Sequence, residues 1–368
     1  MLKFYKPIAL IFASLPPPLG GVASIVKILH DSLSEDTRVI FVSPVPSLRS
    51  NAAIKFRFLF NFYKLLKSIF LIKSDGKVLL FSSANKSFYE KILWALVTII
   101  FRRKPVLVMV DGNFPYFWSR LNPPIKFIIS LIICHKSFQL ITQSPSWEKY
   151  YKVLFSGANV SIVNATCSSN FLADQKNPYF RKGSINLIYI GWVIPEKGVL
   201  DLLDAMGFLL NATIDVNLRI IGPLFDRASY WEGEALKRGV ADHVTFVGSL
   251  HDSANVIREL DLASIFVFPS HFEGFPVALL EAISRGLPCI GSSVGGITDI
   301  LDHGKAGLLV DPKNPKQIAS AIERLIRDGD LVADLSSRAF ARSRTEYSHS
   351  KCIKSYKRAL GLNNIRND

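Results

Sequence analysis

The chain has 368 residues, of which 49% are hydrophobic and 20% are charged. This length exceeds the ~250–300 residues at which a single core stops growing, and the composition excludes a disordered chain, so we expect two globular domains. The four cysteines stand singly, which favours a reducing compartment and argues against a zinc site or a disulfide framework. They are Cys134, Cys167, Cys289 and Cys352.

The formal net charge is +14, and the whole excess lies in the first half of the chain. Residues 1–180 contain 22 basic and 8 acidic side chains, whereas residues 181–368 contain 22 of each. A generally solvating surface would be expected in both halves. The basic half instead predicts contact with an anionic surface, either a nucleic acid or a membrane.

The chain begins with two lysines and a short apolar run, Ile8 to Leu15. A signal peptide could look similar, but no small-residue cleavage site follows, so we interpret the run as a buried first strand. The longest later apolar runs, residues 92–101 and 127–134, are shorter than the ~20 residues needed to cross a bilayer. No transmembrane helix is therefore predicted.

Short β-rich runs alternate with longer helical patterns along the chain. Runs that are apolar almost throughout and separated by helices are typical of parallel sheets covered on both faces. We therefore predict an α/β fold of two doubly wound, Rossmann-like domains. The expected strands are residues 7–14, 37–43, 77–83, 105–111 and 138–144, followed by 185–191, 216–222, 243–248, 264–270, 287–293 and 306–311.

Polar and turn-forming residues interrupt this alternation at residues 172–184, so we place the domain boundary there. The predicted N-terminal domain comprises residues 1–178 and the predicted C-terminal domain residues 183–345. Residues 346–362 keep helical spacing, which predicts a terminal helix that packs back toward the first domain.

Two glutamates lie eight positions apart beyond the strand expected at 264–270, Glu273 in a loop and Glu281 in the helical pattern that follows Pro276. Ligands of parallel sheets bind beyond the carboxyl ends of the strands, and free N–H groups at a helix start can face a phosphate or a sugar hydroxyl. Carboxylates accept hydrogen bonds from vicinal hydroxyls, so such a pair could hold both ends of a nucleotide sugar. Two glutamates alone, however, are more often surface charges on an amphipathic helix.

The surrounding sequence favours the first interpretation. "PSHFEGFPVALLEAISRGLPCIGSSVGGITDIL", followed by "GKAGLLVDPKNPKQIASAIERLIRD", resembles the signature region of the retaining GT-B glycosyltransferases of family 4, also called glycosyl transferases group 1. Glu273 and Glu281 match that family's E-x7-E pair. The likeness covers residues 185–330, whereas "PPPLGGV" in the first half matches only weakly. It implies a GT-B fold in which two Rossmann-like domains face a central cleft.

The resemblance also implies a role for each matching residue. Glu281 would bind the ribose hydroxyls of the donor. Glu273, with the backbone of Gly274 and Phe275, would hold the transferred sugar near its anomeric carbon. Lys197 would neutralise the leaving diphosphate, although a single lysine is more often a solvated surface group.

Two glycine pairs complete the implied donor site. Gly20 and Gly21 would offer backbone N–H groups to the same phosphates from the first domain. Gly295 and Gly296 suggest a similar close approach of the backbone. Glycine pairs alone are more often ordinary turns.

The chain departs from the family pattern at two positions that matter for chemistry. Trp192 stands where the family usually has an arginine that helps to bind the diphosphate. Asp111 stands where many relatives have a histidine; it could orient the acceptor hydroxyl, but an aspartate after a strand is often only a helix or turn cap. The seven histidines are dispersed and no paired-aspartate motif sits in a suitable loop, so we expect no metal and no cofactor.

The implied function is transfer of a hexosyl-type sugar from a nucleotide-sugar donor to an acceptor hydroxyl, with retention of configuration. Because no candidate nucleophile is evident, front-side displacement is favoured. Two alternatives remain open. One is a sugar-nucleotide epimerase on the same scaffold, and the other is a non-catalytic membrane-binding protein, which Trp192 and Asp111 make conceivable.

The basic stretch 52–73 and the run "KILWALVTIIFRRK" mix cations with large apolar residues at helical intervals. We find no nucleic-acid-binding module in them, and the mixture suits a membrane surface. We therefore predict a cytoplasmic enzyme docked on the inner face of the plasma membrane, extending a lipid-linked glycan in surface polysaccharide synthesis. The cations are Lys55, Arg57, Lys64, Lys67 and Lys73 in the first segment and Arg102, Arg103 and Lys104 in the second.

Overall fold

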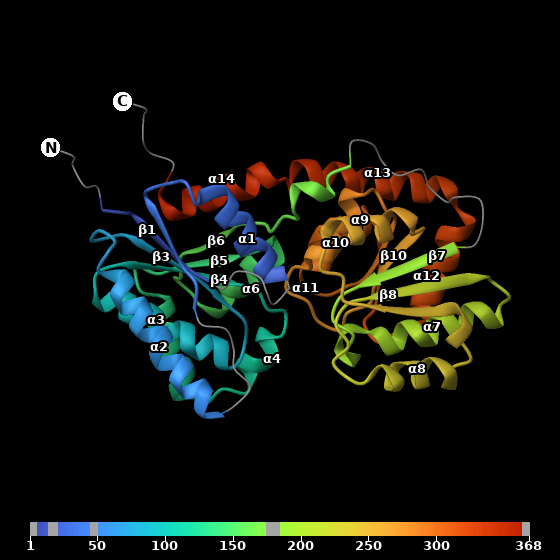
Figure 1. The fold of residues 1–368 in the computed structure, drawn as a ribbon, viewed down its shortest axis with the longest axis horizontal. Coiled ribbons are helices and arrows are strands. Elements are labelled where there is room, and N and C mark those ends of the chain that lie inside the picture. Colours follow the sequence, from blue (N-terminus) through green and yellow to red (C-terminus); the bar gives the residue numbers. More distant parts are fainter. Residues whose placement is uncertain (1–5, 14–20, 45–50, 174–184, 363–368) are drawn as a thin grey trace. The chain divides into compact units, whose positions relative to one another are not determined.

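The computed structural model describes residues 6–13, 21–44, 51–173 and 185–362. The chain forms two compact units, the first made of residues 1–165 with 349–368 and the second of residues 166–348. The boundary expected at residues 172–184 lies almost wholly outside the described residues. Each unit contains a parallel six-stranded sheet flanked by helices (Figure 1), which confirms the predicted α/β class with two Rossmann-like domains. The central cleft expected between them stays a prediction.

The first sheet has the strand order β2-β1-β3-β4-β5-β6, and all neighbouring strands are parallel. Five of its strands were predicted, because each is a continuous apolar run. The sixth, β6, was missed, since three residues with a central serine are too short to show a pattern. The strands are β1 Ala9–Phe12, β2 Val39–Val42, β3 Lys77–Ser82, β4 Lys104–Met109, β5 Gln139–Thr142 and β6 Val160–Ile162.

Helices cover both faces of this sheet, α2 and α3 on one side and α1 and α14 on the other (Figure 1). On the α3 side, the ring of Trp94 packs edge-on against Phe12 of β1, with centroids 5.0 Å apart. On the other side, Tyr356 of the terminal helix lies 6.4 Å from Phe81. The helices are α1 Gly21–Leu33, α2 Asn51–Ile69, α3 Lys86–Ile100, α4 Phe114–Ser119, α5 Pro123–Ile133, α6 Pro145–Leu154 and α14 His349–Leu360.

The second sheet has the order β12-β11-β10-β7-β8-β9, again parallel throughout. All six strands lie where the sequence predicts them. They are β7 Ile185–Ile190, β8 Val216–Ile221, β9 Val244–Gly248, β10 Ile265–Phe268, β11 Cys289–Ser292 and β12 Leu308–Val310. The α-helices are α7 Val199–Asn211, α8 Ala228–Lys237, α9 Ser253–Leu262, α10 Val277–Ser284, α11 Gly295–Ile300, α12 Pro315–Arg327 and α13 Gly329–Thr345. Four short 3₁₀ turns are η1 Ser169–Phe171, η2 Pro195–Lys197, η3 Ala241–His243 and η4 Asp302–Gly304.

The strand order of the second unit places the loops after β11, β10 and β7 side by side, and these loops contain or lead to predicted site residues. Because β10 lies between β11 and β7, the loop after β10 has the loops after those two strands as neighbours. The first contains the Glu273 segment, and the others lead to α11 and to Lys197. No helix in the described part of the chain is long and apolar enough to span a membrane.

Candidate active site

Glu273 and Lys197, 76 residues apart in sequence, meet at the carboxyl edge of the second sheet. The Lys197 ammonium group forms an ion pair and hydrogen bond with Oε2 of Glu273. Ser270 Oγ donates to the same carboxylate oxygen over 3.1 Å. Both charged side chains are largely shielded from solvent, with exposed fractions of 18% and 15%. The structure therefore brings together two residues with implied roles at the reacting bond.

A glycine permits this meeting. Gly198, which follows Lys197, has φ 73°, and a Cβ there would lie 2.0 Å from the carbonyl oxygen of Pro269. The next residues of the β10 loop are tied to the same segment, since the His271 N–H donates to the Glu196 carbonyl over 3.0 Å. Its ring nitrogen Nε2 lies 2.5 Å from Asp201 Oδ2. These bonds give His271 a structural role, because they tie the loop after β10 to the segment around Lys197.

Glu281 lies on α10 in a different environment. Burial among the surrounding atoms raises the pKa of its carboxyl group from 4.5 to about 8. Among the described residues, its carboxyl group has no hydrogen-bond or ion-pair partner, although the side chain is only partly buried. Burial raises the pKa of the nearby Cys167 thiol to about 12, and the charge of Glu281 also raises it. A partly accessible carboxyl group without a protein partner is suited to accept ligand hydroxyls.

The predicted backbone contacts form a second part of the site. The Gly296 N–H, in the first turn of α11, donates to the Gly274 carbonyl over 2.9 Å. A Cβ on Gly296 would lie 2.4 Å from that oxygen and 2.6 Å from the Phe275 ring, so only glycine fits. Gly295 has φ 48°, a left-handed conformation that also favours glycine. Three predicted residues, Gly274, Phe275 and Gly296, thus meet, and the Gly296 amide bonds the loop.

The remaining predicted residues belong to the first unit. Asp111 follows β4, and its two carboxylate oxygens accept backbone N–H bonds from Ala84 and Asn113, each 2.8 Å long. This is the capping geometry that the sequence left open as an alternative to catalysis. Gly21 begins α1, and Gly20 lies outside the described residues. A phosphate contact by either glycine and a catalytic role for Asp111 stay predictions.

Two residues that no sequence motif marked, Tyr189 and Phe225, contact Trp192. Tyr189 on β7 is fully buried, and its hydroxyl donates to the Trp192 carbonyl over 2.9 Å. Burial, and then the nearby charge of Glu273, raise the pKa of Tyr189 well above 10. The Trp192 ring is 47% exposed and lies 4.9 Å from Phe225. An aromatic pair therefore occupies the edge where the family pattern predicts an arginine.

In the described part of the chain, no three His, Cys, Asp or Glu side chains are grouped so that they could hold a metal ion. That sugar transfer needs no metal stays a prediction. Lys197 places an ammonium group at the edge of the sheet, where it is paired with the Glu273 carboxylate. A cation in a shielded site stabilises negative charge on a departing phosphate.

The chain is similar to known glycosyltransferases. The family model described as glycosyl transferases group 1 matches residues 172–342. The capsular polysaccharide biosynthesis glycosyltransferase CapM of Staphylococcus aureus is 28% identical over 300 residues, which is 77% of this chain and 76% of that protein. An uncharacterized glycosyltransferase of Methanocaldococcus jannaschii is 25% identical over 347 residues, or 88% and 86% of the two chains.

Solved structures show the same fold over nearly the whole chain. The sucrose-phosphate synthase of Thermosynechococcus elongatus superposes with a TM-score of 0.79 at 16% identity, covering 96% of this chain and 98% of that one. HepE of Anabaena, in complex with UDP-glucose, superposes with a TM-score of 0.72 at 15% identity, covering 96% and 99%. The fold is thus of the GT-B type. Together with the matched region and the named relatives, it identifies the protein as a transferase enzyme, a glycosyltransferase.

Proposed function

We propose that this enzyme is a retaining glycosyltransferase of family 4 that transfers a sugar from a nucleotide-sugar donor to a hydroxyl of a lipid-linked glycan. The observation that carries the proposal is the arrangement of Glu273 and Glu281 in the second unit. The Glu273 carboxylate is paired with Lys197 at the sheet edge, and the carboxyl group of Glu281, on the following helix, has no partner among the residues that the structure describes. Such a pair can hold sugar and ribose hydroxyls of one ligand in different ways.

The two carboxyl groups suit different tasks because their environments differ. Glu281, whose pKa is about 8, is mostly protonated at pH 7 and can both donate to and accept from the ribose hydroxyls. Glu273 is held by Lys197 and Ser270, and can stabilise positive charge that develops at the anomeric carbon. Lys197 is paired with Glu273 and can stabilise the negative charge that develops on the departing diphosphate.

Retention is explained by a front-side displacement. The bond from the anomeric carbon to the diphosphate oxygen breaks, and the bond to the acceptor oxygen forms on the same face of the sugar. The acceptor hydroxyl proton passes to the departing phosphate oxygen, so atoms and charge balance without a protein nucleophile.

Three relatives support the donor and product classes. HepE was solved with UDP-glucose, CapM is named for capsular polysaccharide biosynthesis, and WaaG, a structural neighbour, is described as involved in lipopolysaccharide biosynthesis. By analogy, we propose a nucleotide-sugar donor and a place in the assembly of a surface polysaccharide.

The proposed acceptor requires contact with a membrane, and the first unit has a surface suited to it. Helices α2, α3 and α5 pack next to one another and expose large apolar side chains, including Phe127 and Ile100, each 65% exposed. The other exposed residues of this apolar surface are Leu59, Phe60, Tyr63, Phe70, Leu71, Tyr89, Leu93, Leu96, Ile125, Ile128 and Leu131. We propose that it docks on anionic lipid from the cytoplasmic side, as a peripheral contact.

Charge complementarity favours lipid over a second copy of the chain as the occupant. Exposed cations border the apolar surface, among them Lys67 and Lys73 on either side of Phe70 and Leu71. Lys64 is placed 5.2 Å over the Phe60 ring. Arg103 is the exception, because it donates to the carbonyls of Phe101 and Ile72 and is held in the fold. Two such basic surfaces would repel each other, whereas anionic lipid would attract both.

A donor screen tests the proposed function. Binding of UDP-, GDP- or dTDP-sugars at 100-fold excess over Kd stabilises the folded protein by ~2.7 kcal/mol, which raises the melting temperature by ~5–10 °C. We expect one nucleotide class to do so, and Glu281→Ala to abolish the shift. Incubation with that donor, labelled in its sugar, and membrane extract should then place label in lipid. An epimerised nucleotide would support the epimerase instead, and absence of both binding and product would refute the proposal.

A further inference from the structure

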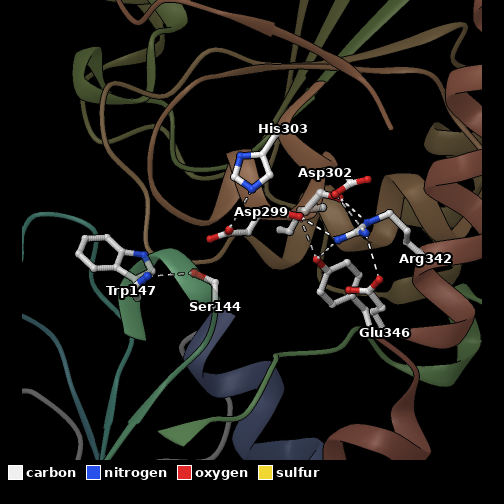
Figure 2. A network of polar contacts seen from close by, with 9 residues as sticks. Ser144, Trp147, Asp299, Asp302, His303, Arg342 and Glu346 are labelled. Atoms are coloured by element: carbon white, nitrogen blue, oxygen red, sulfur yellow. Dashed lines mark hydrogen bonds and ion pairs between the residues drawn. The ribbon is translucent and has the colours of Figure 1, made fainter. Parts of the chain in front are cut away.

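Arg342, near the end of α13, binds the far end of the short helix α11. Its guanidinium group donates from Nε to the Ile300 carbonyl over 3.2 Å and from Nη2 to the Asp299 carbonyl over 3.0 Å. The last carbonyls of a helix have no partner within the helix, so these bonds cap α11. Figure 2 shows the guanidinium group between Asp299, Asp302 and Glu346. Its Nη1 pairs with the side chain of Asp302 at 3.6 Å and with that of Glu346 at 3.0 Å.

Tyr347 connects this cap to the loop that contains Glu273. Its hydroxyl accepts from Arg342 Nη2 over 2.9 Å and donates to the Asp299 carbonyl over 3.1 Å. Burial raises the pKa of Tyr347 to about 12, so the hydroxyl keeps the proton that it donates. The Tyr347 ring meets the Phe275 ring edge-on, with centroids 5.6 Å apart. One buried side chain therefore contacts both α11 and the donor-site loop.

These contacts form a closed circuit around the loop. At the start of α11, Gly296 bonds the Gly274 carbonyl. At the end of α11, Tyr347 and Arg342 donate hydrogen bonds to the Asp299 carbonyl. The ring of Tyr347 also contacts the ring of Phe275. The helix has only six residues and acts as a short rigid spacer between the two contacts. The two residues that follow Glu273 are thus fixed from two directions.

Tyr347 also contacts the segment Thr166–Cys167, which in turn contacts the helix that contains Glu281. Its backbone carbonyl accepts a 2.7 Å bond from Thr166 Oγ1. The neighbouring Cys167 places its Sγ 3.3 Å from Ser284 Oγ, three residues after Glu281 on α10. The supports of the two glutamates therefore converge on one tyrosine.

We infer that Arg342 and Tyr347 are positioning residues of the donor site, which fix Glu273 through Phe275 and the helix α11. The inference rests on the proposed function, because it assigns to Glu273 a contact with the transferred sugar. A small displacement of a group that acts at the reacting bond can lower the rate up to ~100-fold. The loss should appear in kcat, since Glu281 and nucleotide binding are less directly affected.

Conservative variants separate positioning from folding. Tyr347→Phe keeps the ring and removes the hydroxyl, and Arg342→Lys keeps the charge but cannot span both carbonyls and the hydroxyl. Each should lower kcat ~10–100-fold and leave nucleotide affinity within about threefold. Arg338→Lys is the matched control, because Arg338 lies one turn earlier on α13 and forms an exposed pair with Asp334.

Hydrogen exchange gives a readout that does not depend on activity. The amide of Gly296 should exchange faster in both variants, because each removes hydrogen bonds that hold Tyr347 to the end of α11. Unchanged exchange at Gly296, or a fall in kcat no greater than in Arg338→Lys, would overturn the inference. If the wild-type enzyme binds no nucleotide sugar, the proposed function fails, whereas exchange at Gly296 still tests whether these residues hold the loop.

Discussion

Both units are built on a six-stranded parallel sheet, but their side chains form different kinds of surface. In the second unit, 22 acidic residues accompany 18 basic ones, and many meet in pairs, such as Arg219 with Glu259 and Arg285 with Asp261. In the first unit, cations exceed acids, and large apolar side chains lie on the outside of α2, α3 and α5. One architecture therefore supports a polar donor site and a basic, apolar surface, because function resides in loops and outer helix faces.

The largest expected effect concerns the two glutamates of the second unit. Glu273→Gln should lower kcat ~100–1,000-fold, because it removes charge that stabilises the transition state. Glu281→Ala should chiefly raise KM, because the ribose contact is equal in ground and transition states. Glu323→Gln on exposed α12 is the control. Full activity of both site variants in steady-state kinetics would refute the assignment of the donor site to this unit.

The pH dependence of stability tests the environment of Glu281. Burial raises its folded-state pKa to about 8, so the stability it contributes is complete below about pH 4.5 and is lost as pH rises through about 8. Glu281→Gln does not titrate. The unfolding free energy of the variant minus that of the wild type should therefore increase by ~1.4 kcal/mol for each pH unit across this window. Denaturant titrations at several pH values would show a constant difference if the carboxyl group were solvated.

A single methyl group should distinguish the packed loop of the donor site from an ordinary helix surface. In Gly296→Ala, the Cβ would lie 2.4 Å from the Gly274 carbonyl oxygen, and the resulting overpacking should destabilise the fold by ~1–3 kcal/mol. Gly233→Ala, on α8 with open space around it, should instead leave stability unchanged or raise it by up to ~1 kcal/mol. Thermal unfolding compares the two, and equal melting temperatures would contradict the close approach.

Vesicle binding tests the basic surface of the first unit. Each cation near an anionic membrane contributes ~1 kcal/mol, so Lys67→Ser with Lys73→Ser should weaken binding ~30-fold. Co-sedimentation with phosphatidylserine-containing vesicles should show this loss and a further loss with added salt. The control pair, Lys237→Ser with Arg327→Ser, changes exposed cations of the second unit. Equal binding to neutral vesicles, or dimers in place of vesicle binding, would refute docking on anionic lipid.

The smallest effect is expected from chelation. Because Lys197 and backbone groups are proposed to meet the charge of the diphosphate, transfer should continue in EDTA after dialysis. A strict requirement that Mg²⁺ or Mn²⁺ restores would show that the donor site needs a metal, and would leave the surface of the first unit unaffected.

The fold class and eleven of the twelve strands found in the described part of the chain could be predicted from the sequence. Apolar runs separated by helical patterns are local signals, and they suffice to predict parallel sheets. The sequence also marked Glu273 and Glu281, because both lie in one continuous motif. The strand β6 escaped, since three residues carry too little pattern and its place at the sheet edge depends on pairing with β5.

The assembly of the site depends on contacts between segments that are distant in the sequence. Lys197 reaches Glu273 because β7 and β10 are neighbours in the sheet, although 76 residues separate the two side chains. Arg342 and Tyr347 show no motif, and their importance comes from the packing of α13 beside α11 and the Phe275 loop. The raised pKa of Glu281 depends equally on burial by distant atoms. Local patterns specify elements, whereas contacts between distant segments fix the position and charge of the functional groups.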